Sequence, residues 1–225
     1  MTQDFEEVIE LLDRIVEELL SECGITQPPV EPKKIADKLG IVYNEAELGG
    51  RRGQSFRRRG QQHVEVHHKD RPERKHFALA HEIMELQLKK VLDDPKESHR
   101  WANLGASFLL MPGKWFRDEC SRTGFDIAEL KKVFSTASWE AVALRTLNFS
   151  ESIITIVDNA RVTRRKASYP HYVPSKLSDG EKQVVQEVLT TGTVQTLHFA
   201  TCEVTGYPVF EEEHRRVILR TTFDE

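Results

Sequence analysis

The stretch that decides the fold of this chain is RKHFALAHEIME, residues 74–85. Apolar residues recur at helical spacing from Phe77 to Leu88, which predicts a long amphipathic helix. Pro72 stands where a helix can begin, and Glu73 places an acid in the first turn, where the helix dipole favours it. The stretch is therefore predicted to be a helix with one buried face.

This predicted helix carries residues with the chemistry of a metal site. Residues four apart share one face of a helix, so His81 and Glu85 can hold one ion between them. Glu82 then points toward the ion-bound water and can take its proton, as in the H-E-x-x-H motif of metalloproteases. Apolar residues before His81 bury the helix and exclude water from the site. Alone, H-E-x-x-E is a weak signal, because such pairs are usually surface contacts.

Toward the N-terminus the sequence predicts helices and a small sheet. Helical periodicity covers about residues 4–22, and three prolines in 28–32 then indicate an extended connector. A short helix is expected at 33–39, followed by strands at 41–43 and 63–67.

The segment 49–60 is rich in glycine and arginine, with arginines at positions 51, 52, 57, 58 and 59. A solvated hairpin loop is the favoured interpretation, because the chain is acidic overall and only Phe56 is interleaved. A phosphate- or RNA-binding patch is the alternative.

The C-terminal side begins helical and turns to strands after residue 148. Helices are expected at 97–110, 114–122, 126–133, 138–147 and 179–189, and strands at 153–157, 161–164, 194–203 and 215–222. The change predicts a first domain over 1–150 and a smaller α/β region over 151–225.

Composition limits the class of protein. Charged residues make up 30% of the 225 residues and the formal net charge is −4, which argues against general binding to nucleic acid or membrane surfaces. The three cysteines are far apart and odd in number, so no disulfide framework is expected. No signal peptide and no membrane span is recognisable, and we expect a cytoplasmic protein.

Three linked motifs resemble the ImmA/IrrE family of bacterial metallopeptidases. They are PVEPKKIADKLGI at 29–41, RPERKHFALAHE at 71–82, and a segment from the Ala-Asn pair at 102–103 to LLMP at 109–112. They occur in the family's order and at similar spacing, and the resemblance covers about residues 5–165.

The resemblance implies an α+β fold: a zincin-like helical core with a small antiparallel sheet, here followed by the C-terminal α/β region. It also implies a zinc-dependent peptidase that cleaves a helix-turn-helix repressor. His81 would be a metal ligand and Glu82 the general base. Position 85 is usually a histidine in the family. A carboxylate can bind zinc at a similar distance, and it would also tolerate manganese.

The third ligand is the main departure from the family. A glutamate just before the Ala-Asn pair completes the family's site, and here that position is Trp101, which cannot bind a metal. Glu97 and His99 are the alternatives. His99 would restore a set of two histidines and one carboxylate, although on a helix it lies about 200° away from position 101. Asn103 either braces the two helices or orients Glu85.

Two functional hypotheses follow. The first is an active metallopeptidase acting on a protein substrate, with no direct nucleic-acid or membrane partner. The second is a catalytically degenerate regulatory or protein-binding module on the same fold. The pair of Glu82 and a metal-competent Glu85 favours the first, and Trp101 favours the second. The sequence does not indicate an oligomeric state.

Overall fold

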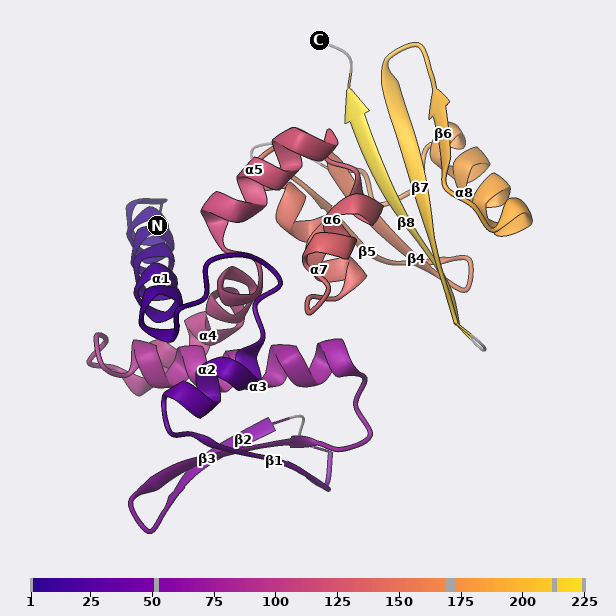
Figure 1. Ribbon diagram of the computed structural model, residues 1–225. Helices are drawn as coiled ribbons and strands as arrows, with labels where there is room; N and C mark the ends of the chain where they lie inside the picture. Colours follow the sequence, from indigo (N-terminus) through magenta and orange to yellow (C-terminus); the bar gives the residue numbers. More distant parts are fainter. Residues whose placement is uncertain (1, 51–52, 169–172, 212–213, 224–225) are drawn as a thin grey trace. The chain divides into compact units, whose positions relative to one another are not determined.

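The computed structural model describes residues 2–50, 53–168, 173–211 and 214–223 (Figure 1). The chain forms two compact units: residues 1–121 with 131–138, and residues 122–130 with 139–225. Arg51 and Arg52 of the arginine-rich segment lie outside the described residues. The α+β fold class is confirmed.

The first unit is a group of helices packed on a small sheet (Figure 1). The predicted site is held by two helices that pack along each other, α3 (Pro72–Leu88) and α4 (Pro95–Leu110). Helix α1 (Thr2–Cys23) packs on α4, and the short α2 (Pro32–Lys38) packs against α3 and α1. Each lies, to within two residues at either end, where a helix was predicted. Asp94 caps α4 by accepting a hydrogen bond from the amide of Lys96 at 2.8 Å.

The sheet of this unit comprises β1 (Val42–Ala46), β2 (Gly53–Arg58) and β3 (Gln61–His67), in the order β1-β3-β2. β2 lies within the segment 49–60 that was interpreted as a hairpin loop, and it pairs antiparallel with β3. β1 pairs with β3 in parallel, so the sheet is mixed and not purely antiparallel as expected. β3 lies in the centre, with Val64 and Val66 buried beneath α3, and β2 is an edge strand.

Three shorter helices follow, also where predicted: α5 (Gly113–Thr123), α6 (Ile127–Val133) and α7 (Trp139–Thr146). Within the first unit, Phe116 packs on Phe134 with ring centroids 5.0 Å apart, and both side chains are fully buried. None of the described helices is long and apolar enough to cross a membrane. The three cysteines form no disulfide.

The second unit is built on an antiparallel sheet with α8 (Asp179–Thr191) packed on it. Its strand order is β5-β4-β8-β7-β6. The strands are β4 (Ile153–Asp158), β5 (Arg161–Ala167), β6 (Gln195–His198), β7 (Cys202–Glu211) and β8 (His214–Phe223).

The predicted bounds of one strand, 194–203, are wrong, because this segment contains two strands, β6 and the start of β7. The rest of β7 was not predicted, because Gly206 and Pro208 interrupt the strand pattern. Gly206 has a packing role, since a Cβ there would come within 2.8 Å of the side chains of Val184 and Val188 in α8.

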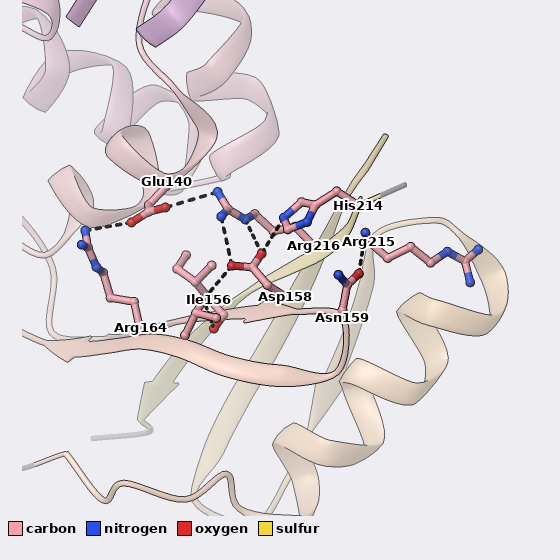
Figure 2. Close-up of polar contacts among 9 residues, drawn as sticks. Glu140, Ile156, Asp158, Asn159, Arg164, His214, Arg215 and Arg216 are labelled. Carbon is pink, nitrogen blue, oxygen red and sulfur yellow. Dashed lines mark hydrogen bonds and ion pairs between the residues drawn. The ribbon is translucent and has the colours of Figure 1, made fainter. Parts of the chain in front are cut away.

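A polar cluster ties α7 to the sheet of the second unit (Figure 2). Arg216 donates from Nε and Nη2 to Asp158 at 2.7 and 3.0 Å, and from Nη1 to Glu140 of α7 at 3.2 Å. His214 also lies 3.0 Å from Asp158, and Arg164 pairs with Glu140 at 2.8 Å. The hydrogen bond from Arg216 lowers the pKa of Asp158 to about 2, so the carboxylate stays ionised in the folded chain.

The compact units do not divide the chain at one point, since α5 and α6 each contribute residues to both. The expected peptidase domain over 1–150, with a C-terminal α/β region over 151–225 that senses a ligand or positions the substrate, stays a prediction.

Candidate metal centre

The predicted site lies on the face of α3 that is turned toward α4. Four apolar residues around it (Leu79, Ala80, Ile83 and Met84) are buried, which fixes the helix in place. His81 and Glu85 project from neighbouring turns and are 14% and 13% exposed. His81 Nε2 lies 3.5 Å from Glu85 Oε2, as their i, i+4 spacing predicted.

A close approach of α4 to α3 brings further donors to this face. The two helices meet at Gly105, where a Cβ would lie 3.0 Å from Met84 Cε and 3.2 Å from Leu12 Cδ2. Two polar residues of α4, four positions apart, consequently reach the site. His99 Nδ1 lies 2.8 Å from Glu85 Oε2, and Asn103 Oδ1 lies 3.0 Å from His81 Nδ1.

The donor set fits a divalent metal ion. One ligand atom each from His81, Glu85 and His99 lies within 4.8 Å of the others. A tetrahedral ion with bonds of 2.0–2.1 Å needs donors roughly 3.3 Å apart, close to the 3.5 Å between His81 and Glu85. Two imidazoles and one carboxylate form a common ligand set of catalytic zinc. His99 is 69% exposed, so the group is open to solvent on that side.

The hydrogen bonds around the group orient its donors. Asn103 Oδ1 can only accept, so His81 donates from Nδ1 and keeps the lone pair of Nε2 facing Glu85. Burial alone would raise the pKa of Glu85, but hydrogen bonds from His99 and Lys89 outweigh it and hold that pKa below its usual range. Glu85 is therefore ionised, as a metal ligand must be.

Glu82 lies on α3 next to the first donor, and its side chain is buried, at 8% exposure. Its carboxylate makes no hydrogen bond or ion pair within the described part of the chain. The edge strand β2 passes beside it, and an ideal Cβ on Gly53 would lie 3.5 Å from Glu82 Oε1. A carboxylate in this place, one residue from the candidate ligand His81, is where a general base would be needed.

Of the two alternatives for the third donor, the structure brings His99 and not Glu97 into the group. The indole of Trp101 donates to Glu97 at 3.0 Å, so these two residues pair with each other. Positions 99 and 103 face α3, although α4 begins earlier than expected, at Pro95. The angle of about 200° was measured from position 101, whereas the two residues of α4 that reach His81 and Glu85 are at positions 99 and 103. His99, although it lay off the predicted face, is the residue that meets Glu85.

Sequence reasoning missed two neighbours of the site, Lys89 and Gly53. Lys89 is at i+4 from Glu85, a spacing that signals an ion pair on a helix. No local signal points to Gly53, because its place beside Glu82 depends on how the sheet packs under α3.

Comparison with known proteins supplies a family and a fold. Residues 36–147 match the model of peptidase family M78, the IrrE N-terminal-like domain. Among solved structures, the chain is similar to a Mycobacterium tuberculosis transcriptional regulator, with a TM-score of 0.69 and 14% identity over 95% of this chain and 76% of that one. At that identity the likeness shows the fold alone. No curated protein matches the chain.

Proposed function

This chain belongs to the IrrE N-terminal-like family of peptidases, and we propose that it is an active metal-dependent peptidase with His81, Glu85 and His99 as the metal ligands. The observation that carries the proposal is the convergence of these three donors from two helices. The family's set of two histidines and a carboxylate is kept, with the carboxylate at 85 and a histidine at 99. Two imidazoles favour zinc over the harder manganese ion.

Each residue then has a chemical task. The bound metal would supply Lewis-acid chemistry, polarising the scissile carbonyl and acidifying water. Glu82 accepts the proton of the attacking water and passes it to the leaving amine. Asn103 holds the imidazole of His81 through Nδ1. The buried apolar side chains of α3 keep bulk water from the inner side of the centre.

The substrate we propose is a protein, bound as an extended segment along β2. β2 is the edge of its sheet, and an edge strand offers unpaired backbone groups to a peptide. Gly53 of β2 has no side chain to cover Glu82, so a peptide there would reach the general base. A helix-turn-helix repressor in the cytoplasm is the specific substrate we propose, in a stress or mobile-element response.

One observation favours a catalytically degenerate module instead. Glu85 already has two partners, since His99 binds Oε2 and Lys89 binds Oε1. Both oxygens of the Glu85 carboxylate thus have hydrogen-bond partners without a metal ion, as they would in a purely structural cluster.

The experiment that separates these functions compares the wild type with Glu82→Gln. Both zinc-loaded proteins are incubated with a proteome-derived peptide library, and new termini are identified by mass spectrometry. The peptidase predicts cleavage by the wild type and its loss in Glu82→Gln at equal zinc content. Equal patterns in both proteins, or no cleavage by either, would contradict it. A stable protein partner captured equally by both would support the module.

A further inference from the structure

Lys89 stands at the edge of the candidate metal centre, one turn beyond Glu85. It directly follows α3, and its amide donates to the carbonyl of Glu85 at 3.0 Å, which fixes its backbone. Its side chain is 40% exposed, and Nζ lies 2.5 Å from Glu85 Oε1. Lys89 therefore approaches the carboxylate from the solvent side.

The two oxygens of Glu85 are divided between different partners. Oε2 is 2.8 Å from His99 Nδ1 and 3.5 Å from His81 Nε2, whereas Oε1 is held by Lys89. A carboxylate can bind a metal through one oxygen or through both. With Oε1 held by an ammonium group, only Oε2 faces the other donors.

We propose that Lys89 is a positioning residue that holds Glu85 to single-oxygen coordination. This inference rests on the proposed function. A catalytic zinc site needs three protein donors and an open position for water or substrate. If Glu85 bound through both oxygens, the second oxygen would be a further donor beside that open position, which would raise the coordination number and crowd the water or substrate. Lys89 thus keeps the centre competent for substrate.

The charge of Lys89 supports the same role. The resemblance places a neutral histidine at position 85, and this chain has an anion there. Paired with Lys89, Glu85 forms a unit with no net charge, which therefore resembles imidazole more closely than a lone carboxylate does. Where a carboxylate replaces histidine at position 85, Lys89 thus offsets the added negative charge and leaves one donor atom facing the metal, as a histidine would.

Cobalt(II) tests the proposal, because its visible absorption is strong in four-coordinate sites and weaker at higher coordination. Spectra of the cobalt-loaded wild type, Lys89→Met, Lys89→Arg and Lys90→Met are compared at equal bound cobalt. Lys90 is the matched control: it has the same charge and lies on the same helix end, but it binds Gln87 at 2.7 Å.

We expect Lys89→Met to lower the molar absorption of bound cobalt by about two-fold or more, as the freed oxygen raises the coordination number. Lys89→Arg and Lys90→Met should keep the wild-type spectrum. An unchanged spectrum in Lys89→Met, with cobalt bound to both proteins, would overturn the role of Lys89 alone. A wild type that binds no cobalt would overturn this inference together with the proposed function.

Discussion

The Nδ1 atom of His81 lies 3.0 Å from Oδ1 of Asn103, and this contact joins α3 to α4 at the candidate metal centre. Of the two interpretations of Asn103 left open by the sequence, it supports the brace between the two helices, because the amide oxygen is hydrogen-bonded to His81 of α3. Because the amide oxygen can only accept, the contact selects the tautomer of His81 that has a free lone pair on Nε2.

Replacing Asn103 should therefore weaken metal binding. We expect Asn103→Leu to lower zinc affinity by roughly 10- to 100-fold, because His81 loses the acceptor that orients it. Asn103→Asp keeps an acceptor at the same place and should stay near the wild type. Zinc affinity is measured by competition with a chromophoric chelator. Equal affinities of Asn103→Leu and the wild type would show that this contact does not orient the ligand.

Gly105 should control the spacing of the two helices that hold the centre. We expect Gly105→Val to lower the free energy of unfolding by roughly 1–3 kcal/mol, because its side chain overlaps Met84 and Leu12. Zinc affinity should fall as well, since His99 moves away from Glu85. Urea unfolding and the same zinc competition measure the two effects. A destabilised variant with unchanged zinc affinity would contradict the link between helix spacing and the centre.

Gly53 should be needed for cleavage without being needed for metal binding. A leucine side chain at this position would lie over the carboxylate of Glu82. We expect Gly53→Leu to reduce cleavage by about 10- to 100-fold, as small displacements at a reacting centre do. Zinc content should remain that of the wild type. Full cleavage by Gly53→Leu would argue against a peptide bound along β2.

The polar cluster of Figure 2 should make the second unit sensitive to acid. Asp158 has a pKa of about 2 when folded, against 3.8 for the free side chain. Its stabilisation is therefore present above about pH 4 and is lost as the pH falls through about 2, in total on the order of 2 kcal/mol.

Urea unfolding at pH 7 and pH 3 checks this expectation. Asp158→Asn should be less stable than the wild type at pH 7, and the difference should shrink at pH 3. Asp179→Asn is the control, because that side chain is fully exposed and its pair with Lys182 lies on the surface. A constant difference between Asp158→Asn and the wild type at both pH values would rule out this linkage.

The helices of the first unit were predictable because their signals are local. Periodicity, a proline at the helix start and the i, i+4 pair of His81 and Glu85 are all set by neighbours in the chain. The recognition of the family was also confirmed, and it depended on linked motifs.

The features that the sequence left open or did not indicate depend on contacts between distant segments. His99 meets Glu85 because α4 packs closely at Gly105, and the phase of one helix does not contain that information. The parallel pairing of β1 with β3 is likewise a tertiary choice. Most of β7 was missed because local breakers, Gly206 and Pro208, are tolerated where a neighbouring helix and strand support them.

The most direct test of the metal centre is the zinc content of the purified protein under metal-replete conditions, measured by mass spectrometry. We predict about one zinc per chain for the wild type and almost none for Glu85→Ala or His99→Ala. Glu97→Ala, the control, should keep its zinc, because Glu97 binds Trp101 outside the centre. A wild type without zinc, or a His99→Ala variant with undiminished zinc, would contradict the centre proposed here.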